Sequence, residues 1–200
     1  MQKTIRLLMF VTILTAVYAC GDDNSDKVEP GKKFIHYDNQ IISLDEGLLK
    51  VNKVGNGYVL FDLILYSINY NIDNETGALV LGYGNGSYMQ FTICVTKTIR
   101  DINGDGILTV HDLLPNDITL SAGKYNYSSA EGQNITFVGA KISIDDPKNE
   151  LYTVESGTLE VKTSGSSFII DFDGVDTKGK SVFCNYTGKI KYLYGNQVLS

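Results

Sequence analysis

One segment of the sequence places oxygen-bearing side chains at the spacing of a calcium-binding loop. Such a loop coordinates the ion through side chains at positions 1, 3, 5 and 12, a backbone carbonyl at position 7 and often a water at position 9, with Gly at position 6. In residues 101–112 these positions hold, in the same order, Asp101, Asn103, Asp105, Asp112, Ile107 and Thr109, with Gly106 at the turn. The spacing therefore predicts one bound calcium ion. Its role is structural, because Asp at position 12 is a shorter ligand than Glu and suits the weak affinity of extracellular sites.

This segment resembles an EF-hand loop, and most closely the variant found in dockerins, because Leu108 is apolar and Leu113 directly follows the last ligand. The flanks depart from that family: residues 92–99 are typical of a strand, and Pro115 ends any helix after Asp112. The resemblance therefore implies a calcium ion, whereas the docking to a cohesin that defines dockerins is not expected. A plain polar hairpin connection is the alternative, since Asp, Asn and Gly also form turns.

Residues that could carry catalysis are few. The two histidines, His36 and His111, lie near no recognisable nucleophile turn and lack zinc-ligand spacing. Asp171, Asp173 and Asp176 could be metal ligands, but strand alternation and a turn explain them as well. The sequence therefore predicts no catalytic residues and a protein that is not an enzyme; a glycosidase, which needs only two carboxylates, is the alternative.

The N-terminus is typical of an exported lipoprotein. Lys3 and Arg6 precede an apolar run, residues 7–17, which is too short to span a bilayer as a helix and ends before Cys20. Residues 17–20, Val-Tyr-Ala-Cys, resemble a lipobox, so the resemblance implies that residues 1–19 form a signal peptide and that Cys20 is acylated. Two acyl chains hold a domain firmly at a membrane without spanning it.

An acidic tether follows the lipidation site, over residues 20–33. Its acidic residues resemble the export tag of Bacteroidetes surface lipoproteins, which implies an outer-membrane lipoprotein exposed at the cell surface. A disordered spacer is the alternative. Removal of residues 1–19 removes two of the 17 Lys and Arg residues and none of the 23 Asp and Glu residues, which changes the formal net charge from -6 to -8. No basic stripe remains for a nucleic acid.

The remaining residues, 34–200, predict a single all-β domain. Tyr, Thr, Ile and Val are plentiful, and single glycines separate short alternating runs, as in strands joined by turns. The expected strands cover residues 40–44, 48–53, 58–72, 78–82, 87–99, 123–128, 135–144, 157–162, 168–173 and 181–192.

The pattern of burial expected for these strands is mixed. Residues 58–65 are apolar at both alternating sets of positions, which predicts cover on both faces, whereas residues 89–96 and 158–162 alternate apolar with polar. Mixed burial fits an antiparallel β-sandwich with one calcium-loop insertion, or alternatively a β-barrel of calycin type. Cys94 and Cys184 fall on faces of different polarity, which favours two separate thiols over a disulfide, although the compartment permits one.

The end of the chain also has a familiar pattern. Residues 157–161, 168–172, 176–180 and 186–188 together resemble the three-strand ending of many Bacteroidetes surface lipoproteins of undefined role. The resemblance implies fold and location and no particular activity. We therefore expect a binding or adhesion module for a glycan or a protein, or alternatively a barrel-shaped carrier of a small apolar ligand.

The lipidation site yields the first prediction. Cys20→Ser removes the only thiol that the lipobox-like segment offers for acylation, so the variant should remain unprocessed or become soluble. Partitioning of both forms into detergent, followed by immunoblotting, measures this. Equal membrane retention of the variant and the wild type would contradict the prediction.

Overall fold

A computed structural model describes residues 33–73, 78–82, 86–102, 104, 106, 109, 112–113, 118–128, 136–144, 151–194 and 197–199. The chain divides into two units, Met1–Pro30 and Gly31–Ser200, and every described residue belongs to the second. The predicted signal peptide, Cys20 and the tether up to residue 32 lie outside the described residues. Within the described part of the chain, no helix combines the length and apolarity needed to cross a membrane.

The described part of the domain is all-β, as the sequence predicts. Its strands are β1 (Phe34–Tyr37), β2 (Gln40–Ser43), β3 (Glu46–Gly55), β4 (Tyr58–Tyr66), β5 (Tyr70–Ile72), β6 (Leu79–Leu81), β7 (Tyr88–Thr96), β8 (Gly123–Tyr127), β9 (Thr136–Ser143), β10 (Leu151–Ser164), β11 (Ser167–Asp176), β12 (Ser181–Gly188), β13 (Ile190–Tyr194) and β14 (Gln197–Leu199).

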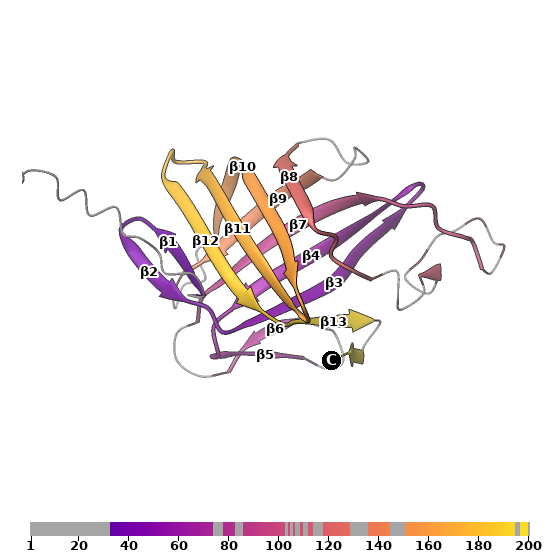
Figure 1. Ribbon diagram of the computed structural model, residues 1–200, viewed down its shortest axis with the longest axis horizontal. Coiled ribbons are helices and arrows are strands. Elements are labelled where there is room, and N and C mark those ends of the chain that lie inside the picture. The colour runs from indigo at the N-terminus through magenta and orange to yellow at the C-terminus, as the bar shows by residue number, and fades with distance from the viewer. Residues whose placement is uncertain are drawn as a thin grey trace, which may run out of the picture. The chain divides into compact units, whose positions relative to one another are not determined.

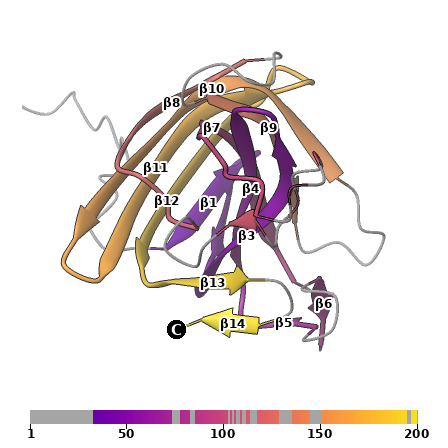
Figure 2. The same ribbon diagram turned by 90° about the vertical axis from the view of Figure 1, so that its right-hand side faces the viewer.

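Twelve of these strands form one sheet in the order β14-β13-β3-β4-β7-β9-β8-β10-β11-β12-β1-β2, and β5 pairs separately with β6. Neighbours are antiparallel except for two pairs, β3 with β13 and β8 with β9. The sheet curls strongly, so that β3 and β4 lie across the interior from β10, β11 and β12 (Figures 1 and 2). Phe91 on β7 therefore contacts Phe172 on β11, with ring centroids 5.1 Å apart, although three strands separate β7 from β11 in the sheet order.

Two expected strands are in fact interrupted. Residues 58–72 form β4 and β5 with a turn between them, because the Ile68 amide donates to Asp45 Oδ2 at 2.7 Å and the Tyr70 amide donates to the Ser67 carbonyl at 3.1 Å. Residues 181–192 form β12 and β13, and the Tyr186 hydroxyl donates to the Lys189 carbonyl at 2.7 Å across the break. The chain can therefore leave β12 and join β3 in parallel.

Strand β1 was not expected from the sequence. It forms a hairpin with β2 in which Tyr37 pairs with Gln40 across two residues of positive φ, Asp38 at 49° and Asn39 at 62°. A two-residue turn with positive φ at both positions matches the twist of the strands, and Asp and Asn tolerate that conformation. The hairpin adds β1 to β12, where Ile35 pairs with Cys184.

Large side chains fill the interior of the curled sheet. On β4 the alternate residues Val59, Phe61, Leu63 and Leu65 are buried in the main core. In the same core an aromatic cluster packs edge to face, with Phe137 5.7 Å from Phe172 and 6.3 Å from Phe91 between ring centroids; this geometry suits aromatic rings.

The other face of β4 is also covered, which confirms the expectation of burial on both sides. Ile64 and Tyr66 are buried there in a second, smaller core that also contains Leu48 of β3, Tyr70 of β5 and Leu193 of β13. The separate hairpin β5–β6 therefore lies over the outer face of β3 and β4. At the edge of this second core, polar side chains therefore lie next to apolar side chains.

The buried carboxylate of Asp176 anchors the turn between β11 and β12. Asp176 is only 1% exposed, and its carboxylate accepts a hydrogen bond from the Tyr37 hydroxyl at 2.6 Å and from the amides of Lys178 and Lys180, each at 2.8 Å. Burial would raise the pKa of Asp176, but these three hydrogen bonds outweigh it and hold the pKa below its ordinary value. The turn is thereby tied to β1.

Asp176→Asn should destabilise the domain by about 2 kcal/mol at pH 7, the usual loss for a hydrogen bond to a charged group. A carboxyl whose pKa is depressed by folding stabilises above its unfolded pKa, so the difference from wild type should shrink as the pH falls below about 3.9. Urea melts at pH 7 and pH 3 measure this. Asp173→Asn, which removes an exposed carboxylate from the same strand, is the control. A difference that is the same at both pH values would contradict the prediction.

Candidate functional site

The predicted calcium loop curls around its first ligand. Both oxygens of the Asp101 carboxylate accept backbone hydrogen bonds, Oδ1 from Gly104 at 2.6 Å and Oδ2 from Gly106 at 2.7 Å. Both glycines have positive φ, 68° at Gly104 and 79° at Gly106, which residues with a side chain rarely adopt. The loop therefore bends back toward the carboxylate, as position 6 of a calcium loop requires.

The last predicted ligand lies at the other end of the same loop. Asp112 is only 3% exposed, and its Oδ2 accepts from the Thr109 amide at 2.7 Å and the Thr109 hydroxyl at 3.0 Å. Its Oδ1 accepts from the Ile102 amide at 3.0 Å, which joins the end of the loop to its beginning. The following residue, Leu113, is buried in the main core and attaches the loop to the domain.

The described carboxylates leave some oxygen lone pairs for the predicted calcium ion, which prefers oxygen ligands. Both oxygens of Asp101 and Oδ1 of Asp112 accept one amide hydrogen bond each and keep a second lone pair, whereas Oδ2 of Asp112 already accepts two hydrogen bonds from Thr109. Asn103, Asp105, Ile107 and also His111 lie outside the described residues. Among the residues that are described, no group of three or more His, Cys, Asp or Glu side chains is placed to hold a metal.

The three aspartates near the end of the chain do not converge on one site. Asp171 accepts a hydrogen bond from Asn185, Asp173 is exposed, and Asp176 is buried against Tyr37. Strand alternation and a turn therefore account for the positions of all three aspartates.

The two described cysteines, Cys94 and Cys184, form no disulfide with each other, as the alternation of their strands favours. Cys94 is nevertheless fully buried and does not lie on a wet face, because it pairs in register with Leu60, which is itself buried. Cys184 is buried in the main core, where loss of hydration raises the pKa of its thiol.

A continuous row of side chains crosses the outer face of six strands. The register aligns, from β2 to β8, Ile41, His36, Phe183, Asp173, Thr158 and Asn126. We call this row the outer row. Partners directly opposite each other in a sheet point to the same face, so the row presents apolar, carboxylate, hydroxyl and amide groups side by side.

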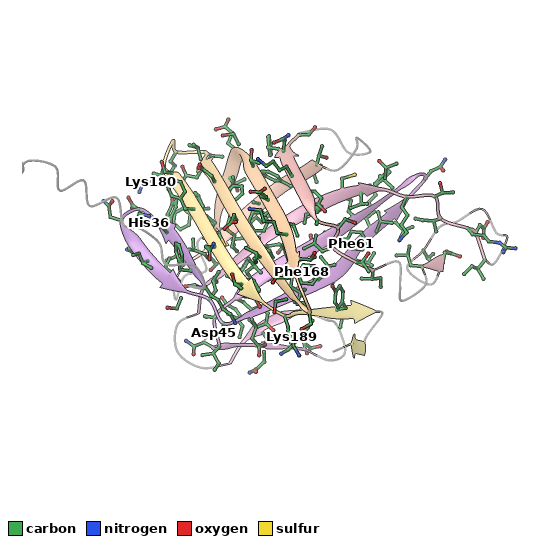
Figure 3. All side chains as sticks on the ribbon, in the orientation of Figure 1. His36, Asp45, Phe61, Phe168, Lys180 and Lys189 are labelled. Atoms are coloured by element: carbon green, nitrogen blue, oxygen red, sulfur yellow. The ribbon has the colours of Figure 1, made fainter. Side chains whose placement is uncertain are left out.

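The apolar end of the outer row is exposed and ordered by ring packing. His36 and Phe183 stack with ring centroids 6.1 Å apart and 27° between their planes, and Phe183 is 40% exposed. Ile41 beside them is 65% exposed. Figure 3 shows His36 at the end of β12 where Lys180 lies, whereas Asp45 and Lys189 lie toward the opposite end. A group of exposed apolar side chains of this kind marks a contact surface more often than isolated ones do.

Sequence reasoning did not find this surface. His36 follows the tether by only three residues in the sequence, and Phe183 is one residue in an alternating run. The Asp38–Asn39 turn between two short apolar runs was the available signal for the β1–β2 hairpin, but it does not indicate that β1 pairs with β12, where Tyr37 meets Val182, 145 residues later.

Comparisons with family models, curated proteins and solved structures find no match to this chain.

Calcium should stabilise the domain. An ion that binds only the folded state adds about 2.7 kcal/mol when its concentration is a hundredfold above Kd, so melting should shift upward in millimolar calcium and fall with chelator. The paired change Asp101→Ala and Asp105→Ala should abolish the shift, because it removes two of the three carboxylates that the loop offers. Calorimetry measures the shift, and Glu155→Ala with Asp173→Ala is the matched control outside the loop. An absence of calcium-dependent melting together with no binding at millimolar ion would contradict the calcium site.

Proposed function

We propose that this protein is a non-catalytic, carbohydrate-binding lipoprotein of the bacterial cell surface. The outer row is its binding face, and the observation that carries the proposal is the exposed stack of His36 and Phe183 beside Asp173. A sugar ring has an apolar face and a polar edge, so it can lie on an aromatic pair while its hydroxyls bond to carboxylate, hydroxyl and amide groups.

The polar half of the outer row supports this proposal. Thr158 Oγ1 donates to Asn126 Oδ1 at 3.2 Å, and both side chains remain accessible to a ligand. In the neighbouring row the Asn185 side-chain amide donates a hydrogen bond to Asp171 Oδ1. Nearby, Lys162 Nζ lies 3.1 Å from Glu160 Oε2. These groups are held in place by one another, which lowers the entropy that a ligand would lose on ordering them.

The interior of the sheet gives less support to the carrier alternative. An apolar ligand needs a lined cavity, whereas the main core is packed with Phe61, Phe91, Phe137 and Phe172 in contact with one another or with neighbouring apolar residues. The continuous order of twelve strands in one curled sheet supports the barrel-type architecture over two stacked sheets. We therefore propose a half-barrel that is filled and binds on its outside.

The remaining parts of the proposal concern location and the ion. Acylation of Cys20 would anchor the domain to the outer membrane, and the acidic segment after it would direct the domain to the cell surface. A calcium ion held by Asp101, Asn103, Asp105, Ile107, Thr109 and Asp112 would keep the loop folded against the core through Leu113. In this arrangement the ion stabilises the module and does not contact the glycan.

A glycan array probed with the detergent-solubilised mature protein tests the binding face. We expect Phe183→Ala to weaken binding about tenfold, because it removes the exposed ring on which a sugar would lie. Leu151→Ala, which removes another exposed apolar side chain outside the row, is the matched control and should bind as the wild type does. Binding that survives Phe183→Ala unchanged, or a wild type that binds no glycan but captures a protein ligand through this face, would contradict the proposal.

A further inference from the structure

A second polar cluster lies on the outer face of β3 and β4, away from the outer row. The Glu46 carboxylate oxygen Oε2 accepts a hydrogen bond from the Tyr66 hydroxyl at 2.7 Å and from the Lys191 ammonium at 2.5 Å. The three residues come from β3, β4 and β13, which are neighbours in the sheet. The cluster therefore exists only because β13 pairs with β3 in parallel.

This cluster forms one wall of a pocket of about 320 Å³. The other wall comes from the turn and strand after β4, where Ile68, Asn71 and Ile72 line the pocket. The volume lies at the lower end of the range for small-molecule sites, roughly 300 to 1,000 Å³. We call this space the hairpin pocket, because β5 of the β5–β6 hairpin supplies Asn71 and Ile72.

Hydrogen bonds in the polar wall favour the ionised form of Glu46 and the neutral form of Tyr66. The hydrogen bond from Lys191 is the main reason that the pKa of Glu46 lies below its ordinary value, and the bond from Tyr66 adds to it. Burial, and then the bond to Glu46, raises the pKa of Tyr66. Both bonds go to Oε2, so within the described residues Oε1 keeps its lone pairs for a donor from a ligand.

The apolar wall contains one side chain with no evident role in stability. Ile68 is 75% exposed, yet its amide donates to Asp45 Oδ2 at 2.7 Å, which holds the residue at the mouth of the pocket. Tyr70 below it is buried in the second core and packs edge to face against Tyr88, with ring centroids 5.6 Å apart. The pocket is thus polar on the sheet side and mixed on the hairpin side, where Asn71 lies among the apolar side chains of Ile68 and Ile72.

These features select the chemistry of a ligand. The lining contains one carboxylate and one ammonium, so a ligand with a net charge would be attracted by one of them and repelled by the other and would gain little from its charge. A hydroxyl can donate to Glu46 Oε1 while another accepts from Lys191, without breaking the ion pair. The apolar face of a sugar ring can then contact Ile68 and Ile72.

We propose that the hairpin pocket binds one neutral pyranose ring, either free or at the end of a glycan chain. This inference rests on the proposed carbohydrate-binding function for the choice of ligand, but it uses a site separate from the outer row. A single ring bound at the pocket and a chain lying along the outer row would be two independent contacts of the same protein.

Titration calorimetry of the detergent-solubilised mature protein with methyl glycosides of neutral hexoses tests the proposal. We expect saturable binding of at least one of them, and binding weakened about tenfold by Glu46→Gln and by Lys191→Met, since each removes a charged hydrogen-bond partner. Glu155→Gln and Lys124→Met, exposed residues on other strands, are matched controls and should bind as the wild type does. Ile68→Ser should weaken binding several-fold, and because Ile68 is so exposed this variant keeps the fold.

Three results would overturn the proposal: no saturable binding of any neutral glycoside at tens of millimolar, binding unchanged in all pocket variants, or tighter binding of N-acetylneuraminic acid or of a zwitterionic amino acid. An oligosaccharide ending in the same sugar distinguishes a chain end from a free ring, and binding of either supports the pocket. If pocket variants have no effect while Phe183→Ala abolishes glycan binding, this inference fails and the proposed function stands. If Phe183→Ala has no effect while the pocket variants abolish binding, the outer row fails and the pocket stands.

Discussion

The rest of the structure depends on the packing of one sheet against itself. A single flat sheet would leave both faces in water, whereas this sheet curls until Phe91 of β7 reaches Phe172 of β11. The concave face is consequently removed from solvent almost entirely, and its side chains must be apolar and large enough to fill the space. Only the outer face and the connections between strands are then available for polar groups.

One part of the outer face of the sheet is covered by other residues, and another part is exposed to solvent. Over β3 and β4 it is covered by the β5–β6 hairpin and by Leu193 of β13, which creates the second core. Over β12, β1 and β2 the stacked pair of His36 and Phe183 remains accessible. Both proposed contact sites follow from this division: one lies at the edge of the covered part and the other on the exposed part.

Two buried carboxylates near the connections between strands keep their hydrogen bonds. Asp176 is buried at the β11–β12 turn, and Asp112 is buried at the end of the calcium loop; in both, backbone amides replace the water that the carboxylate loses. A buried carboxylate without such donors would be costly. The same hydrogen bonds of Asp112 join the end of the loop to Ile102 near its beginning.

Local patterns in the sequence determined much of this protein. Alternation and single glycines predict an all-β domain, the apolar positions of residues 58–65 predict a strand covered on both faces, and the spacing of residues 101–112 predicts a loop bent at Gly106. Each of these depends on neighbours within about a dozen residues, so the information is present in one short segment.

The tertiary structure alone decided which distant residues meet. Glu46, Tyr66 and Lys191 come together because β12 ends at Gly188 and β13 continues beside β3, and no local pattern encodes that pairing. His36 meets Phe183 because β1 pairs with β12. The physical reason is that strand pairing is set by the backbone and by the packing of the whole core, while the residues on the outer face contribute little to the choice of partner.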